Sequence, residues 1–280
     1  MSTLYLVATP IGNLGDISAR ALQTLRDVSL IAAEDTRRTA KLLSHFNIHT
    51  PQTSYFDHNK GTKLGKVLAA MQKGDVALVC DAGSPALNDP GYLLVRAAVE
   101  AGHTVSPIPG PSAPVAALTA SGLPSDQFVY LGYLPRKSGQ RRTVIRDVAH
   151  MPYTLIWLES PHRLSAALED LGAELGARQI AVAGELTKMY EEIFRGTIEQ
   201  AIAHFKQHPA RGEYTLVVEG HSGEKPAWNE AEVRARLDEL LAKGESPSQA
   251  ARTVAKESGW PRREIYALST QIPADEEDDQ

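Results

Sequence analysis

The chain has 280 residues, which is enough for two domains of ordinary size. Hydrophobic residues make up 42% and charged residues 22%, as in soluble globular proteins, and no apolar run approaches the roughly 20 residues of a membrane-spanning helix. The formal net charge of -5 equals the charge of the five acids in residues 275–279, so the remainder sums to zero and excludes no nucleic-acid partner.

Cysteine content and the N-terminus bear on the compartment. Cys80 is the single cysteine, which rules out an internal disulfide and favours a reducing environment. The first residues, MSTLYLVATPIG, have neither the basic segment nor the apolar core of a signal peptide and are typical of a first strand. We therefore expect a cytoplasmic protein without a membrane anchor.

The first part of the chain alternates apolar runs with amphipathic segments. Runs at residues 4–8, 30–33, 76–80 and 105–108 predict strands, and the segments after them predict helices. Such alternation favours a mostly parallel sheet with helices on both faces. We assign it to an N-terminal α/β domain, residues 1–122.

A second series of strands begins near residue 127, with the runs FVYLGYL, TLIWLES, QIAVAGEL and EYTLVVEG. The segment EEIFRGTI, residues 191–198, follows closely after a strand and predicts an antiparallel hairpin. Residues 123–222 are therefore predicted to form a second, mixed α/β domain. Residues 223–270 predict three short helices with a helix-turn-helix-like spacing, and residues 271–280 a disordered acidic tail.

Several common signatures are missing from the sequence. The turn ATPIGNLGD does not fit the G-x-G-x-x-G of dinucleotide folds, and GTKLGKV (residues 61–67) is one residue short of a P-loop. Neither Ser84 nor Ser112 sits in G-x-S-x-G. Two histidine pairs, His45/His49 and His204/His208, lack a third ligand, so we expect solvated histidines and no metal site. The glycine and proline turns at strand ends suit a cofactor without a phosphate, such as S-adenosylmethionine.

Seven segments together carry a family resemblance. They are TPIGNL (9–14), AAEDTRRT (32–39), CDAGSPALNDPG (80–91), PIPGPSA (107–113), ESPHR (159–163), GELTK (184–188) and GEYTLVVEG (212–220). In order and spacing they resemble the tetrapyrrole-methylase superfamily from residue 3 to about residue 270. They are most similar to its ribosomal RNA branch, the 16S rRNA cytidine 2′-O-methyltransferases.

The resemblance implies a two-domain tetrapyrrole-methylase fold with S-adenosyl-L-methionine in the cleft between the domains, and a homodimer. It also implies methylation of a cytidine ribose in 16S rRNA of the small ribosomal subunit, near the decoding centre. Two alternatives stay open: a small-molecule methylase of the precorrin type, and a non-catalytic RNA-binding ribosome-assembly factor. The C-terminal helical unit and the basic linker LGYLPRKSGQRR (131–142), which joins the two α/β domains, argue against the first.

The resemblance also implies the residues that hold the cofactor. Ser84 stands where the superfamily has an acid, so Asp81 is a candidate to supply a carboxylate instead. Several of these positions suit plain turns or core as well. The predicted cofactor residues are Pro10, Gly12, Asp81, Gly83, Ser84, Pro85, Leu87, Ala113, Pro114, Val115, Leu158, Leu186 and Thr215.

Methyl transfer to a ribose hydroxyl requires alignment of the reacting groups and gains from a proton acceptor. The candidates are Glu34, Asp35, Asp89, Glu159 and Lys188, each weighed against a structural ion-pair role. Asn13 and His162 are further candidates to position ribose or phosphate. RNA contact also requires cations that neutralise phosphates. The predicted RNA-contacting cations are Arg37, Arg136, Lys137, Arg141, Arg142, Arg163, Arg262 and Arg263, with a solvated linker or a packing role as the competing interpretation.

Overall fold

The computed structural model describes residues 1–55, 60–88, 91–208, 210–223 and 228–269. Its residues group into two compact units, Met1–Gly220 and His221–Gln280, and each is described by itself. Within the described residues, no helix is long and apolar enough to cross a membrane.

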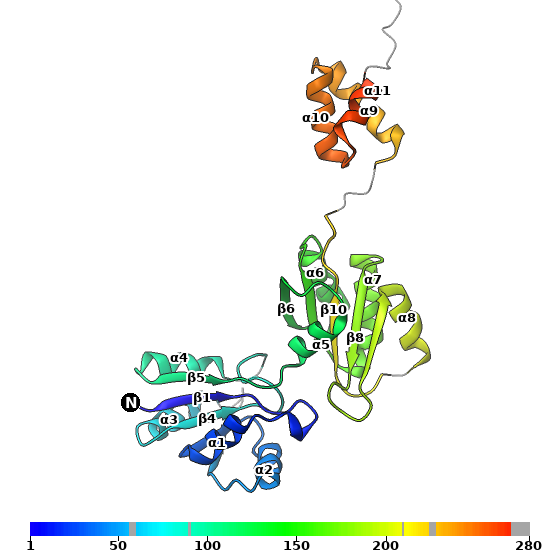
Figure 1. The fold of residues 1–280 in the computed structure, drawn as a ribbon. Coiled ribbons are helices and arrows are strands. Elements are labelled where there is room, and N and C mark those ends of the chain that lie inside the picture. Colours follow the sequence, from blue (N-terminus) through cyan, green and yellow to red (C-terminus); the bar gives the residue numbers. More distant parts are fainter. Residues whose placement is uncertain (56–59, 89–90, 209, 224–227, 270–280) are drawn as a thin grey trace, which may run out of the picture. The chain divides into compact units, whose positions relative to one another are not determined.

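The larger unit begins with a five-stranded parallel sheet of order β3-β2-β4-β1-β5 (Figure 1). Its strands are β1 (Thr3–Val7), β2 (Leu30–Ala33), β3 (Gln52–Ser54), β4 (Val76–Val79) and β5 (Thr104–Ile108). Strand β4, at the centre, is buried along its whole length because helices cover both faces of the sheet. Helices α1 (Ala19–Asp27) and α2 (Thr36–His45) pack on one face, and α3 (Lys60–Met71) and α4 (Tyr92–Glu100) on the other.

A second five-stranded sheet has the order β6-β7-β10-β8-β9. Its strands are β6 (Phe128–Tyr133), β7 (Thr154–Glu159), β8 (Gln179–Gly184), β9 (Glu192–Thr197) and β10 (Tyr214–Val218). Only β6 and β7 pair in parallel, and β8 and β9 form the predicted antiparallel hairpin. Helices α6 (Ser138–Val148), α7 (Leu164–Leu175) and α8 (Ile198–Gln207) bury one face.

Helix α5 (Ala113–Ser121) covers the other face of the second sheet. It begins directly after the PGPS turn that follows β5, and it ends at Gly122 in the left-handed conformation that favours glycine. Ala117 and Leu118 pack against β7, β8 and β10. The chain therefore passes to the second sheet through α5, which keeps the turns before it at the junction of the two sheets.

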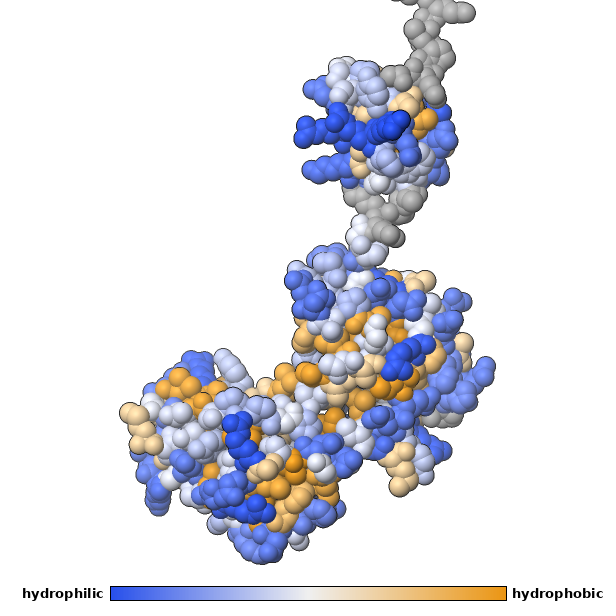
Figure 2. All heavy atoms as spheres, viewed as in Figure 1, coloured by the Kyte–Doolittle hydropathy of each residue, from blue (hydrophilic) through white to orange (hydrophobic). Residues whose placement is uncertain are grey.

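The smaller unit consists of α9 (Glu230–Ala242), α10 (Pro247–Ser258) and α11 (Arg262–Ser269), which confirms the predicted three helices. Asn229 and Ser246 start the first two with capping boxes. Its core is apolar and small. The face seen in Figure 2 is mostly hydrophilic. The two α/β sheets and the helical unit confirm the predicted fold class.

One strand was not expected from the sequence, and the segment set aside as a P-loop is part of a helix. Strand β3 is only three residues, QTS, and has no apolar run that would mark it in the sequence. The GTKLGKV segment lies within helix α3 rather than in a loop. A helix there leaves no loop of backbone N–H groups to hold a phosphate.

Candidate active site

A cavity of about 280 Å³ lies where loops from the two sheets meet. The first sheet contributes the loops after β1, β2 and β4, and the chain continues into the wall with Ser112 and the first residues of α5. The second contributes the ends of β6, β7 and β10 and the loop after β8. Of the predicted site residues, the cavity wall includes Glu34, Asp81, Gly83, Ser84, Leu87, Ala113, Pro114, Leu158, Leu186, Lys188 and Thr215.

The loop after β4 is tied to the loop after β1. Thr9 N donates to Gly83 O at 2.8 Å, and Gly83 N donates to Thr9 O at 3.0 Å. Gly83 has a φ of +83°, a conformation that favours glycine. Ala86 and Asn88, with φ of 66° and 62°, hold the same left-handed conformation without being glycine. Backbone strain of this kind clusters at functional sites.

Two carboxylates join the ends of β2 and β4. Glu34 Oε2 accepts from Asp81 N at 3.1 Å, and Asp81 Oδ1 accepts from Asp35 N at 3.1 Å. Asp81 Oδ2 lies 3.1 Å from Nη1 of Arg38. Because each carboxylate is held by the neighbouring strand end, Glu34 and Asp81 have fixed positions in the cavity wall.

The loop after β8 closes the cavity from the second sheet. Glu185 and Thr187 have φ of 50° and 64°, and Lys188 Nζ lies 2.6 Å from Glu185 Oε1. Thr187 Oγ1 is buried and has no hydrogen-bond partner among the described atoms. A Cβ at Gly12 would lie 2.5 Å from Lys188 Cγ and 2.9 Å from Leu186 O. Gly12 therefore allows the close approach of the two loops.

The other predicted catalytic residues lie outside this wall. Asp35 caps α2, and its hydrogen bonds with the Arg37 side chain hold the pKa of its carboxyl well below the usual range. Glu159 is fully buried and accepts hydrogen bonds from Ser160 N and from Arg163. Both carboxylates thus hold structural positions. Asp89 lies outside the described residues.

Comparisons with known proteins agree with this architecture. The family model for tetrapyrrole (corrin/porphyrin) methylases matches residues 3–202, and that for the RsmI C-terminal HTH domain matches residues 229–271. The chain is 49% identical to ribosomal RNA small subunit methyltransferase I of Synechocystis, over 98% of this chain and 100% of the relative. It is 45% identical to the protein of that name from Halalkalibacterium halodurans, over 95% and 94% of the two chains.

The chain belongs to the tetrapyrrole methylase family, in its ribosomal RNA small subunit methyltransferase I branch. Solved structures share the fold at low identity. Diphthine synthase matches with a TM-score of 0.59 and 16% identity, over 78% of this chain and 90% of that one. Uroporphyrin-III C-methyltransferase of Thermus thermophilus matches with a TM-score of 0.54 and 19% identity, over 80% and 96%.

Four predicted cofactor residues of this tetrapyrrole methylase lie outside the main cavity wall. Pro10 lines a second cavity, beside the first. Gly12 contacts the loop after β8, as described above. Pro85 is buried within the loop after β4, and Val115 is exposed on α5.

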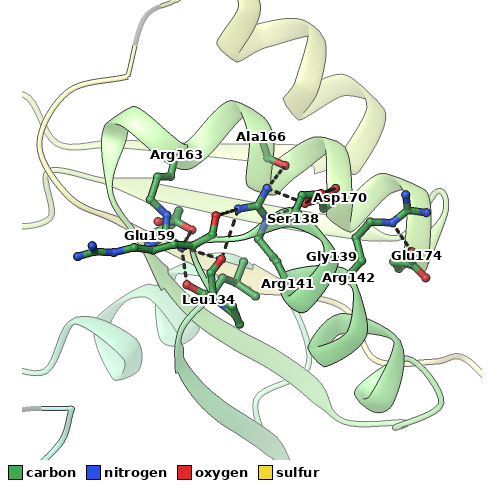
Figure 3. A network of polar contacts seen from close by, with 12 residues as sticks. Leu134, Ser138, Gly139, Arg141, Arg142, Glu159, Arg163, Ala166, Asp170 and Glu174 are labelled. Carbon is green, nitrogen blue, oxygen red and sulfur yellow. Dashed lines mark hydrogen bonds and ion pairs between the residues drawn. The ribbon is translucent and has the colours of Figure 1, made fainter.

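Arginines of the basic linker, and Arg163 nearby, take part in a network of polar contacts (Figure 3). Arg141 is 4% exposed, and its guanidinium donates to Asp170 Oδ2 from Nε at 2.7 Å and to the Ala166 carbonyl. Arg163 donates to buried Glu159 and to the Leu134 carbonyl. The guanidinium of Arg141 is therefore engaged inside the fold, and the side chain of Arg163 is similarly engaged. A contact of either residue with RNA stays a prediction that these internal contacts do not favour.

The other predicted cations differ in their surroundings. Arg37 is exposed but paired with Asp35, and Arg142 is paired with Glu174 at 2.6 Å. Arg136 and Lys137 are exposed at the start of α6. In the helical unit, Arg262 donates to Ser248 Oγ at 3.0 Å, and Arg263 is exposed beside it. Arg136, Lys137, Arg262 and Arg263 thus remain available to an RNA partner.

The free energy of unfolding is expected to depend on pH through the Glu174 carboxyl. Hydrogen bonds from Arg146 and Arg142 lower the pKa of its carboxyl from 4.5 to about 2. Because the folded-state pKa is lowered, the stabilisation is present above pH 4.5 and is lost as the pH falls through about 2. Unfolding measured from neutral pH downward should show that Glu174→Gln destabilises most near neutrality and progressively less below pH 4.5.

Glu169 provides the control for this measurement, because it lies on the same helix but is exposed. Its ion pair with Lys206 is a long one, with Oε1 3.7 Å from Nζ. Glu169→Gln should change stability little at any pH. An equal, pH-independent loss in Glu174→Gln would show that the carboxylate acts through packing alone.

Several wall residues of the methylase were not predicted from the sequence. Arg38 is the most consequential, because it lines both cavities, whereas its neighbour Arg37 was predicted. The N-cap at Asp35 fixes the orientation of the first turn of α2, and Arg38, three residues after the cap, points toward Asp81. The remaining wall residues that were not predicted are Ile11, Ala82, Asn88, Ser112, Tyr130, Tyr133, Glu185, Glu213 and Tyr214.

No group of three or more His, Cys, Asp or Glu side chains placed to hold a metal occurs in the part of the chain that the structure describes. His204 and His208 stack with ring centroids 4.4 Å apart, and His204 Nε2 lies 3.3 Å from Glu192 Oε1. This histidine pair is therefore accounted for by contacts within α8 and to β9.

Proposed function

We propose that the chain transfers a methyl group from S-adenosyl-L-methionine to the 2′-hydroxyl of a cytidine ribose in 16S rRNA, near the decoding centre of the small ribosomal subunit, and that it acts as a cytoplasmic homodimer. The observation that carries this proposal is the cavity built from both sheets, with Glu34 and Asp81 on the wall from the first sheet and Lys188 on the wall from the second. The names of the relatives support an rRNA substrate.

The methyl donor is S-adenosyl-L-methionine, and the residues of the cavity fit it. Backbone turns at residues 81–88 and 112–114 offer N–H and C=O groups without a phosphate-binding signature. Leu87, Leu158 and Leu186 supply apolar surface for an adenosyl group, and Asp81 supplies a carboxylate for an ammonium or a ribose hydroxyl. When bound, the cofactor supplies an electrophilic methyl group on a sulfonium sulfur.

We assign Glu34 as the acceptor of the ribose proton. Of the predicted acids, Glu34 and Asp81 line the cavity, and Asp81 is assigned to the cofactor. The proton leaving the 2′-hydroxyl would pass to the Glu34 carboxylate, which makes the ribose oxygen a better nucleophile. Lys188, held by Glu185, is a hydrogen-bond donor suited to orient the ribose or its phosphate.

The exposed cations give the RNA its docking surface in this proposal. Arg136 and Lys137 lie just after β6, whose residues Tyr130 and Tyr133 line the cavity. Arg262 and Arg263, at the start of α11, would contact phosphates from the helical unit. Phosphate contacts of this kind position an RNA without reading its sequence.

A label-transfer experiment tests the proposed function against its rivals. The protein would be incubated with tritiated S-adenosyl-L-methionine and either small ribosomal subunits from an unmodified source or a precorrin. Label on rRNA is the expected result. Label on the macrocycle would indicate a tetrapyrrole methylase instead, and binding of subunits without label would indicate an assembly factor.

Ser84→Trp tests the cofactor position separately. Ser84 lines the cavity, so an indole there would fill the space assigned to the adenosyl group. Calorimetric titration should detect no binding of S-adenosyl-L-methionine, while the thermal unfolding transition is retained. Ser44→Trp, at an exposed position of α2, is the matched control and should bind normally. Undiminished binding by Ser84→Trp would contradict the placement.

A further inference from the structure

A second cavity of about 190 Å³ adjoins the first, and Arg38 and Asp81 belong to the walls of both. Resting on the proposed function, we propose that this second cavity is a subsite for the nucleotide next to the methylated one. Arg38 and Lys41 would hold its phosphate, and the apolar wall around Leu14 would receive its base or ribose.

The charges of the second cavity suit a phosphate. Arg38 reaches across to Asp81 at 3.1 Å, yet 68% of its side chain is exposed, so further donors of its guanidinium face solvent. Lys41 is exposed and has no ion pair within the described ranges. Asp81 is the single acid of this wall, and its two oxygens already accept from Arg38 and from the Asp35 N–H. The wall therefore has a surplus of one positive charge.

The apolar part of the wall suits a nucleotide better than a free anion. Leu14 is 40% exposed on the 3₁₀ turn Leu14–Asp16, whose position is fixed because Asn13 accepts a hydrogen bond from Gly15 N at 2.9 Å. Pro10 and Leu42 extend this surface. RNA outside a duplex is commonly held by apolar contact with a splayed base together with contact to its phosphate.

The shared wall explains how the two cavities would act together. A nucleotide in the first cavity has its ribose near Glu34, and the adjacent phosphate must lie within one nucleotide of it along the chain. Arg38, which lines both cavities, stands at the point where that phosphodiester would pass. Binding in the second cavity would thus orient the ribose in the first.

Methylation kinetics with small ribosomal subunits test this subsite. Loss of one phosphate contact reduces the slope of log affinity against log salt concentration by about 0.7. At 0.1 M salt this corresponds to a loss of affinity of about fivefold. We expect Lys41→Ala to raise KM for the subunits by about fivefold at 0.1 M salt and to flatten the salt dependence of KM by about 0.7. Leu14→Ser should raise KM roughly tenfold with the salt slope unchanged, because it removes apolar contact only.

Lys73→Ala is the matched control. Lys73 is exposed just before the amino end of β4, whereas both cavities lie beyond the carboxyl end of that strand. It should change neither KM nor the slope. Calorimetry should show unchanged affinity of Lys41→Ala for S-adenosyl-L-methionine. If the unaltered protein methylates subunits while Lys41→Ala and Leu14→Ser match it in KM and slope, the subsite is wrong and the proposed function stands. If the unaltered protein methylates no subunits, both fail.

Discussion

Replacing Glu34 with glutamine is expected to lower kcat for methyl transfer by about 10²- to 10⁴-fold, the usual range for loss of a general base. The amide oxygen of glutamine can still accept from Asp81 N, as Glu34 Oε2 does at 3.1 Å, so the loop after β4 should keep its position. Single-turnover methylation of small subunits would measure the rate, and calorimetry would show whether cofactor affinity is retained.

Asp35→Asn is the matched control for this prediction. Asp35 is adjacent in sequence but caps α2 and is paired with Arg37, and asparagine is an equally good cap. This variant should keep most of the activity. A normal rate in Glu34→Gln together with a large loss in Asp35→Asn would reverse the assignment of the proton acceptor.

Replacing Arg141 with methionine is expected to destabilise the larger unit by about 3–5 kcal/mol, because it leaves the Asp170 carboxylate buried without its partner. The Arg141 Nη2 to Asp170 Oδ2 distance is 2.6 Å, and both side chains are nearly buried. Ser138 Oγ also donates to Asp170, at 3.0 Å to each oxygen, but it brings no charge. Chemical denaturation would measure the free energy of unfolding.

Two further variants separate burial from RNA contact. Arg141→Met combined with Asp170→Leu should recover much of the lost stability, since an apolar pair replaces the ion pair. Arg136→Met, at an exposed position five residues earlier, should change stability by less than about 0.5 kcal/mol and weaken RNA binding instead. Unchanged stability in Arg141→Met would contradict the structural role.

The strand-end loops could be predicted because their chemistry is local. Glycine and proline turns mark the loops after β1 and β4 and the start of α5, and these loops supply most of one cavity wall. Arg141 also had a readable signal, since it shares a helix face with Ile145 and Val148, four and seven residues on. This signal is lost when residues 138–148 are taken for a linker, because the burial of Arg141 follows from its place on the apolar face of a helix.

Other features depend on contacts between distant segments. Glu34 and Asp35 are consecutive acids, and their different roles follow from the cap on α2 and the hydrogen bond from the Asp81 backbone, 47 residues away. Tyr133 and Glu185 join the cavity wall only because the second sheet meets the loops of the first. The spacing of residues within one segment does not predict which residues of another segment will lie beside it.

Nucleoside analysis by mass spectrometry is the most direct test of methyl transfer to a cytidine ribose. Unmethylated small subunits would be incubated with the protein and S-adenosyl-L-methionine, and their rRNA digested to nucleosides. We predict 2′-O-methylcytidine, formed by the unaltered protein and strongly reduced with Glu34→Gln. Methylation on a base, or no methylated nucleoside with fully active subunits, would contradict the proposed reaction.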